Sequence, residues 1–219
     1  MLKGDGIDKI FDNPAKNHIS NSEVKDVALF FGSFNPIHVG HTSLANYLIQ
    51  NNFSDEVWFV VSPCNPLKHQ DQLLDEYLRL DMLMLAIQHE PQFKACDIEF
   101  TLPIPSYTID TLHELSRQYP GHRFKLMIGS DNALVFDQWK NPEQILNEFP
   151  IFVYPREGYD FSEVALKYPQ MHLLNTPLYS VSSTIIRQSL IQKKDVSHWL
   201  HPSVNQFIVE NKLYSSLNF

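Results

Sequence analysis

Residues 28–45, ALFFGSFNPIHVGHTSLA, have the pattern of a strand that is followed, after a sharp turn, by a helix. The apolar run ends at Gly32, which suits a strand buried on both faces of a sheet. Residues 41–50 follow with apolar side chains at helical spacing. Two histidines, His38 and His41, stand at this junction. The stretch therefore predicts a strand–turn–helix unit whose turn holds both histidines.

The same alternation of strand and helix continues along the chain. We expect strands at residues 27–33, 56–62, 94–100, 123–130, 151–155 and 171–176. We expect helices at residues 41–50, 73–88, 108–119, 182–192 and 204–213, and short helices at 134–139 and 142–147. Right-handed crossovers between such strands give a mainly parallel sheet that helices cover on both sides. The predicted fold is α/β: a single Rossmann-like, doubly wound domain over residues 27–219, preceded by a polar extension at 1–26 with a short helix near 7–11.

Composition excludes several classes of protein. The 219 residues carry 17 basic and 25 acidic side chains, a net charge of −8, which disfavours a nucleic-acid partner. No apolar run approaches the roughly 20 residues that cross a bilayer, and residues 1–26 lack the apolar core of a secretory signal. We therefore expect a cytoplasmic protein with no membrane partner. Cys64 and Cys96 form no CxxC pair, so neither a zinc site nor a disulfide framework is predicted.

The turn GSFNPIHVGH, residues 32–41, has the chemistry of an anion site. Gly32 and Ser33 allow backbone N–H groups to approach a phosphate, and Gly40 leaves room beside the imidazoles. Helix N-termini attract anions, and two histidines three residues apart add donors on one face. The alternative is a helix that is merely capped by histidine. The HExxH, GxxxxGK[ST], GxGxxG and GxSxG patterns are absent, and no metal ligands are predicted.

A second helix start lies near the other end of the chain. VSSTIIR, residues 181–187, opens with the capping residues Ser182, Ser183 and Thr184 and places Arg187 one turn later. A planar guanidinium at a helix N-terminus suits phosphate oxygens. A capped helix with a solvated arginine is the alternative for this segment alone.

Taken together, the two segments resemble the motifs of a known superfamily. GSFNPIHVGH is similar to the HxGH signature of nucleotidyltransferases, and VSSTIIR to their ISSTxIR motif. SYTIDTL, residues 106–112, and IGSDNALVFDQW, residues 128–139, resemble segments of bacterial nicotinate-nucleotide adenylyltransferases. The likeness extends from about residue 27 to 213. It implies adenylyl transfer from ATP to nicotinate mononucleotide, giving deamido-NAD and pyrophosphate in NAD biosynthesis.

The resemblance also implies the site residues. The ATP-binding set is Gly32, Ser33, Phe34, Asn35, His38, His41, Gly129, Asp131, Ser182, Ser183, Thr184 and Arg187, among which His38, His41 and Arg187 are catalytic. The mononucleotide set is Lys68, Tyr107, Thr108, Trp139 and Arg156. Core packing is the alternative for Trp139, and a solvated loop position for Arg156. Mg²⁺ is expected on the ATP phosphates, without dedicated protein ligands.

The sequence departs from the family pattern at two places. Two other functions are alternatives to the one that the resemblance implies. Asn35 replaces the aspartate of many members, and the loop NPLKH at 65–69 replaces PPHK. Another HxGH transferase would use nicotinamide mononucleotide, phosphopantetheine or a cytidylyl acceptor; SYTIDTL and Trp139 favour nicotinate over these. A non-catalytic nucleotide sensor would not need His38, His41, Lys68 and Arg187 together. The sequence is silent on oligomeric state.

Overall fold

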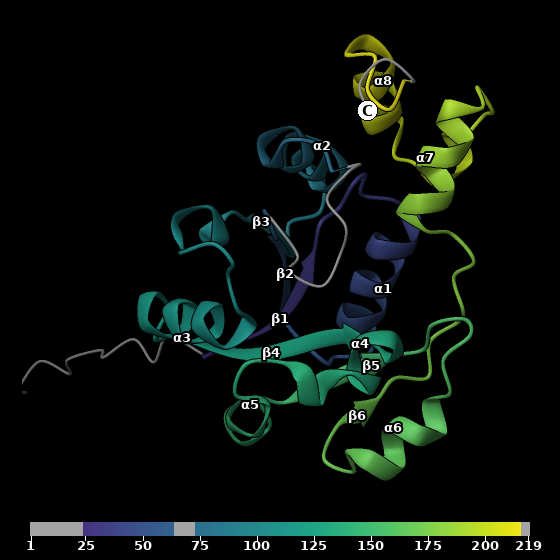
Figure 1. Ribbon diagram of the computed structural model, residues 1–219. Helices are drawn as coiled ribbons and strands as arrows, with labels where there is room; N and C mark the ends of the chain where they lie inside the picture. Colours follow the sequence, from purple (N-terminus) through teal and green to yellow (C-terminus); the bar gives the residue numbers. More distant parts are fainter. Residues whose placement is uncertain (1–23, 64–72, 216–219) are drawn as a thin grey trace, which may run out of the picture.

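Six parallel strands form one sheet in the order β3-β2-β1-β4-β5-β6 (Figure 1). The computed structural model describes residues 24–63 and 73–215. The strands are β1 Lys25–Gly32, β2 Glu56–Val61, β3 Phe93–Cys96, β4 His122–Gly129, β5 Ile151–Tyr154 and β6 His172–Leu173. The order reverses between β1 and β4, as in doubly wound nucleotide-binding sheets. The predicted fold class is confirmed.

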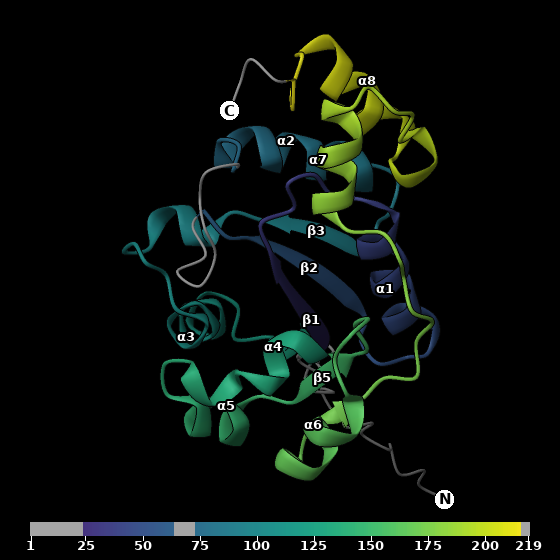
Figure 2. The same ribbon diagram turned by 45° about the vertical axis from the view of Figure 1, so that its right-hand side comes forward.

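Helices cover both faces of this sheet (Figures 1 and 2). One face packs against α1 Val39–Gln50, α2 Glu76–Ile87, α7 Ser183–Ile191 and α8 Pro202–Glu210. The other packs against α3 Thr108–Gln118, α4 Ser130–Leu134, α5 Pro142–Glu148 and α6 Phe161–Lys167. Three 3₁₀ helices complete the described elements: η1 Ile98–Thr101, η2 Phe136–Gln138 and η3 Ser197–Trp199. No helix in the described ranges is long and apolar enough to cross a bilayer.

The central strand explains why both layers form. In β1, Ala28 and Phe30 face the first layer, whereas Val27 and Leu29 face the second, and all four are buried. Successive side chains of a strand point to opposite faces, so a continuous apolar run supplies two cores at once.

Three predicted elements differ from the structure. The strand expected at 94–100 pairs with β2 only as far as Cys96, after which the chain forms η1. Residues 171–176 give only the two-residue edge strand β6, in which His172 and Leu173 pair with Phe152 and Val153 of β5. The helix expected at 134–139 is instead the earlier α4 followed by η2.

The boundary of the N-terminal extension also shifts. β1 begins at Lys25, which pairs with His122 of β4, so the sheet takes in two residues assigned to the extension. The short helix expected near residues 7–11 lies outside the described residues.

Parallel neighbours bring two glycine–serine pairs to one edge of the sheet. β1 ends at Gly32, followed by Ser33, and β4 ends at Gly129, followed by Ser130. Since β1 and β4 are adjacent and parallel, both pairs emerge at their carboxyl ends, at the point where strand order reverses. Ligands of open α/β sheets bind at this position.

Candidate active site

The two histidines close the start of α1 and stack on each other. His38 is the N-cap residue, and its Nδ1 accepts the N–H of Gly40 at 3.2 Å. The backbone N–H of His38 donates to His41 Nδ1, also at 3.2 Å. Because both Nδ1 atoms accept hydrogen bonds, Nε2 is the donor nitrogen of each neutral ring. The ring centroids are 3.7 Å apart, so two imidazole donors flank the helix N-terminus together.

His38 is held as the neutral imidazole. Burial lowers the pKa of His38 to about 3, and the charge of Arg156 acts in the same direction. The packing also explains the neighbouring glycine. A Cβ at Gly40 would lie 3.0 Å from His38 Nδ1, which confirms that Gly40 leaves room for the ring.

The start of α7 packs directly on the turn after β1. Ser182 caps α7, and Ser183 Oγ donates to the carbonyl of Pro36 at 2.9 Å. Arg187 Nη1 donates to the carbonyl of Asn35, also at 2.9 Å. The two motifs recognised in the sequence are therefore in contact, although more than 140 residues separate them.

Both helix starts border one cavity of about 210 Å³, which we call the histidine pocket. Its described lining consists of Phe30, Phe31, Gly32, Ser33, Phe34, Asn35, His38, His41, Leu73, Asp131, Asn132, Tyr154, Arg156, Ser182, Ser183, Thr184 and Arg187. Asp131 is the only carboxylate among them, and Arg156 Nε lies 3.7 Å from its Oδ2. Two guanidinium groups and two imidazole donors suit a polyphosphate.

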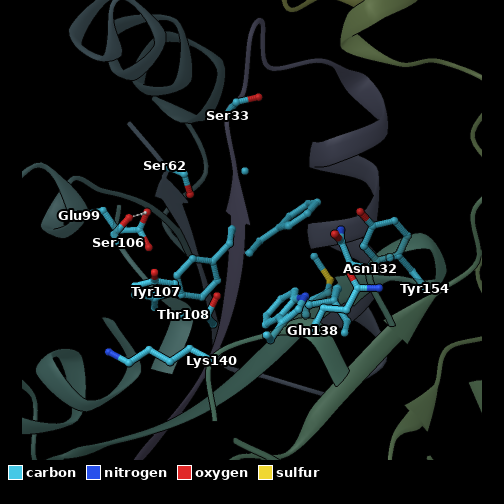
Figure 3. A pocket seen from close by; sticks show the side chains of 17 residues that line it. Ser33, Ser62, Glu99, Ser106, Tyr107, Thr108, Asn132, Gln138, Lys140 and Tyr154 are labelled. Atoms are coloured by element: carbon cyan, nitrogen blue, oxygen red, sulfur yellow. Dashed lines mark hydrogen bonds between the residues drawn. The ribbon is translucent and has the colours of Figure 1, made fainter. Parts of the chain in front are cut away.

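A second cavity of about 250 Å³ lies at the start of α3 (Figure 3), and we call it the aromatic pocket. Its lining consists of Phe30, Phe31, Gly32, Ser33, Ser62, Glu99, Ser106, Tyr107, Thr108, Met127, Ile128, Gly129, Asn132, Gln138, Trp139, Lys140 and Tyr154. Tyr107 is the N-cap residue of α3 and makes no side-chain capping bond. The first N–H groups of this 11-residue helix therefore have no side-chain cap at the pocket.

Neighbouring residues hold the aromatic side chains of this pocket in place. Trp139 packs on Phe136 with ring centroids 5.2 Å apart, so it contributes to the core and to the pocket at once. Lys140 Nζ lies 4.8 Å from the centre of the Tyr107 ring and 2.8 Å from Asp110 Oδ2. A flat ligand would meet aromatic faces that are already fixed.

The two pockets share a wall. Six residues line both of them: Phe30, Phe31, Gly32, Ser33, Asn132 and Tyr154. A Cβ at Gly32 would come within 2.9 Å of the Phe34 ring, so the turn in this wall requires glycine. A molecule in one pocket therefore lies next to a molecule in the other.

The structure brings most of the predicted site residues to the lining of these two pockets, and three need comment. Gly129, expected beside ATP, lines the aromatic pocket, whereas Arg156, expected beside the mononucleotide, lines the histidine pocket. The chain leaves β5 toward the histidine side, which the sequence could not reveal. Lys68 lies outside the described residues.

Sequence reasoning missed Arg79, a fully buried residue of α2. Within the described residues its guanidinium donates to four backbone carbonyls: Ser33 at 2.8 Å, Ser62 at 2.8 Å, Pro63 at 3.1 Å and Leu74 at 2.8 Å. It therefore joins the turn after β1 to both flanks of residues 64–72. Its position on an amphipathic helix gave no signal of this role.

Glu99 was missed as well, because the sequence placed it in a strand. Its carboxyl group accepts hydrogen bonds from Ser106 Oγ and Thr111 Oγ1, both at 2.9 Å (Figure 3 shows the first). Burial raises the pKa of Glu99. The bonds tie η1 to the start of α3. An acidic residue between the apolar residues Ile98 and Phe100 was the available signal.

Comparisons with known proteins identify the family of this chain. The profile of the family described as cytidylyltransferase-like matches residues 29–189. A probable nicotinate-nucleotide adenylyltransferase of Bacteroides fragilis is 48% identical over 83% of this chain and 90% of its own length. A protein of the same description from Cytophaga hutchinsonii is 46% identical over 87% of this chain and 98% of its own. The chain belongs to the nicotinate-nucleotide adenylyltransferase family.

Solved structures agree with this family assignment at the level of the fold. The nicotinic acid mononucleotide adenylyltransferase of Plasmodium falciparum, complexed with NaAD, superposes with a TM-score of 0.73. It covers 87% of this chain and 97% of its own, at 23% identity. At that identity the likeness supports the architecture of the nicotinate-nucleotide adenylyltransferase family and not the individual contacts.

Proposed function

We propose that the chain transfers the adenylyl group of ATP to nicotinate mononucleotide, giving deamido-NAD and pyrophosphate. The observation that supports this most directly is the shared wall between the histidine and aromatic pockets. One pocket is lined by phosphate-binding groups and the other by aromatic rings. Their common edge, at Gly32 and Ser33, is where two bound nucleotides would bring their phosphates together.

The reaction needs no group of the protein to become covalently attached. A phosphate oxygen of the mononucleotide attacks the α-phosphorus of ATP and forms a new P–O bond. The bond from that phosphorus to the bridging oxygen of the β-phosphate breaks, and its electrons leave with pyrophosphate. The nucleophile is already an anion, so the protein's task is to align two anions and stabilise the added charge of the transition state.

The histidine pocket supplies that stabilisation. The backbone at Gly32–Asn35 and the N-terminus of α1 would hold the α- and β-phosphates. The Nε2 donors of His38 and His41 would bond the transferring phosphoryl group as its charge develops. Arg187 and the N-terminus of α7 would hold the outer phosphates.

The aromatic pocket would hold the mononucleotide. Tyr107 and Trp139 offer faces on which a pyridine ring stacks. The N–H groups at the start of α3, near Thr108, would accept the pyridine carboxylate, because a helix N-terminus favours an anion. A neutral carboxamide gains less there, which gives the preference for nicotinate over nicotinamide a physical basis.

Mg²⁺ would enter with ATP. Among the described residues no three His, Cys, Asp or Glu side chains form a metal cluster. Asp131, whose buried Oδ1 has no hydrogen-bond partner within that part of the chain, is the one carboxylate in the described lining of the histidine pocket. This donor set fits a cation that is held chiefly by phosphate oxygens and water. When bound, Mg²⁺ would supply positive charge that offsets the negative charge of the phosphates.

Pyrophosphate release tests the proposal. The full chain is given ATP and Mg²⁺ with either nicotinate mononucleotide or nicotinamide mononucleotide. We expect release with both ATP and nicotinate mononucleotide present, and much slower release with the amide. Equal rates with the two acceptors would show that the N-terminus of α3 does not recognise the pyridine carboxylate. No release with either acceptor, from folded protein that binds ATP, would reject the proposed acceptor.

A further inference from the structure

Tyr214 connects the C-terminal part of the chain to the histidine pocket. Its side chain follows α8 and is fully buried. The hydroxyl donates to Asn35 Oδ1 at 2.8 Å, across 179 positions of sequence. Asn35 lines the histidine pocket and is itself 3% exposed. A hydrogen bond from the far end of the chain thus ends on a residue of the phosphate-binding turn.

The backbone around Tyr214 is shaped for this contact. Tyr214 has φ 58° and Lys212 has φ 52°, both in the left-handed region that non-glycine residues rarely adopt. The chain therefore reverses after α8, where the Leu213 N–H still donates to the carbonyl of Ile208 at 3.0 Å. The positive φ of Lys212 belongs to a Schellman turn that ends α8, in which the Lys212 N–H donates to the carbonyl of Val209 at 3.2 Å. This turn leads the chain to Tyr214, whose own left-handed conformation accompanies its burial and its hydrogen bond to Asn35.

The direction of the hydrogen bond is fixed by chemistry. Burial raises the pKa of Tyr214, with Arg187 and Arg79 acting in the opposite direction. The phenol therefore keeps its proton and acts as a donor at any ordinary pH. Asn35 is held at a second point, since Arg187 donates to its backbone carbonyl at 2.9 Å. Asn35 is therefore bonded both by Arg187 of α7 and by Tyr214, which follows α8 (Figure 2 shows both helices).

We propose that Tyr214 is a positioning residue for adenylyl transfer: its hydroxyl fixes the Asn35 side chain and thereby the turn that holds the ATP phosphates. This inference rests on the proposed function. Tyr214 lines neither pocket, so it would act on the reaction through Asn35. Misplacing phosphate-binding groups by about 1 Å costs on the order of 100-fold in rate, so loss of one anchor should be visible in turnover.

The test is Tyr214→Phe, which removes only the hydroxyl. Tyr168→Phe is the matched control: Tyr168 is also buried, but it packs in the core on the other face of the sheet and lines neither pocket. At a temperature where both variants are folded, we expect Tyr214→Phe to lower kcat roughly 10-fold and to raise the KM for ATP. The KM for nicotinate mononucleotide should stay within about twofold, and Tyr168→Phe should resemble the unmodified chain.

Action through Asn35 is tested by combining substitutions. Asn35→Ala removes the acceptor of the Tyr214 hydroxyl. Adding Tyr214→Phe to this variant should therefore change its kcat/KM by less than about twofold. Full additivity would place Tyr214's effect elsewhere. Unchanged kinetics in Tyr214→Phe, or equal losses in Tyr168→Phe, would overturn the inference.

These outcomes differ from a failure of the proposed function, in which the unmodified chain itself releases no pyrophosphate. In that case, direct titration with a non-hydrolysable ATP analogue still decides the inference. Tyr214→Phe should weaken this binding several-fold relative to Tyr168→Phe. Equal affinities of the two variants for the ATP analogue would overturn the inference about Tyr214.

Discussion

The two histidines at the start of α1 perform different tasks with their two ring nitrogens. Nδ1 of each ring accepts a backbone N–H at 3.2 Å, which shapes the helix start and leaves the proton of each neutral ring on Nε2. Capping and phosphate binding therefore use opposite sides of the same imidazole. Substitutions that mimic one nitrogen at a time can separate the two tasks.

His41 allows this separation to be tested. We expect His41→Ala to lower kcat by roughly 100-fold, as loss of an oxyanion donor does, while the fold is retained. His41→Asn places an acceptor near the position of Nδ1 and should keep the cap, yet remain as slow as the alanine variant. His41→Gln places an amide N–H near the position of Nε2 and should recover part of the rate. Pyrophosphate release measures the rate of each variant, and thermal unfolding measures its stability. Recovery of the rate in His41→Asn alone would show that His41 acts only as a capping residue.

Local motifs revealed one part of the site and long-range contacts the other. His38, His41 and Arg187 stood out because each lies in a short segment whose spacing has a chemical reason. Arg79, Glu99 and Tyr214 join the site only through tertiary contacts, and no spacing in the sequence connects them to it. Arg156 shows the same limit, because the sequence names the residue but not the direction in which its loop leaves β5.

At the scale of elements, α2 holds the turn after β1 in place through Arg79. Arg79→Met would leave the carbonyls of Ser33 and Ser62 without this donor in a buried site. We expect the free energy of unfolding to fall by about 3 kcal/mol, because several buried carbonyls lose a charged donor. The KM values for both substrates should rise, since Arg79 also joins the two flanks of residues 64–72.

A matched arginine on α3 serves as control for this substitution. Arg117 is exposed and bonds only Glu114 among the hydrogen bonds seen in the described residues. Arg117→Met should change the free energy of unfolding by less than about 0.5 kcal/mol. Urea unfolding measures both variants; similar losses would show that the carbonyl bonds of Arg79 contribute little.

The N-terminus of α3 offers a way to delete one backbone donor. Thr108 is the first residue of α3, and Tyr107 before it has the extended conformation (φ −112°, ψ 139°) that a following proline requires. Proline already begins α5 and α8 in this fold. Thr108→Pro should therefore keep the helix while removing its first N–H.

We expect Thr108→Pro to reduce the preference for nicotinate over nicotinamide mononucleotide by roughly 10-fold, the effect of losing about 1.4 kcal/mol of bonding to a charged group. Thr108→Ala retains the N–H and should keep the preference. The ratio of kcat/KM for the two acceptors measures this directly. An unchanged ratio in Thr108→Pro would place carboxylate recognition on another group.

Elements with strong periodicity were predictable, and short elements were not. The buried run of β1 and the amphipathic pattern of α3 are predictable because each buries an apolar surface whose residues repeat at the spacing of its own structure. β3 ends at Cys96 because its pairing with β2 ends there, and β6 pairs only with β5. The lengths of β3 and β6 are therefore set by how far each pairs with its neighbouring strand, which the residues of the strand do not reveal.

For the whole molecule, strand–helix alternation predicted a parallel doubly wound sheet, and right-handed crossovers account for its two helical layers. The sequence could not specify that β1 and β4 would be adjacent, which places Gly32 and Gly129 at one edge. That adjacency places both pockets at the same edge of the sheet. His38, buried in the lining of one of them, affects the stability of the entire fold through its protonation.

Acid should begin to destabilise the protein below about pH 6.5. His38 has a pKa of about 3 in the folded chain against 6.5 for an ordinary histidine. Between these values the unfolded chain binds a proton that the folded chain does not, so the free energy of unfolding falls as pH decreases. The loss approaches about 1.4 kcal/mol per pH unit below pH 6.5. Below pH 4.5 Glu56, whose folded pKa is about 2, adds to the loss.

His38→Gln isolates this contribution. Glu99 acts in the opposite direction, since its raised pKa lets the folded chain take up a proton first, and it is present in both proteins. Urea unfolding of the two proteins between pH 6.5 and 4.5 should give curves that converge toward acid, with the unmodified chain losing about 2 kcal/mol more than the variant. Arg156 and His41, which face His38, stay unchanged in the comparison. Parallel curves would show that His38 takes up its proton in the folded protein at an ordinary pH, and that the pocket does not hold it neutral.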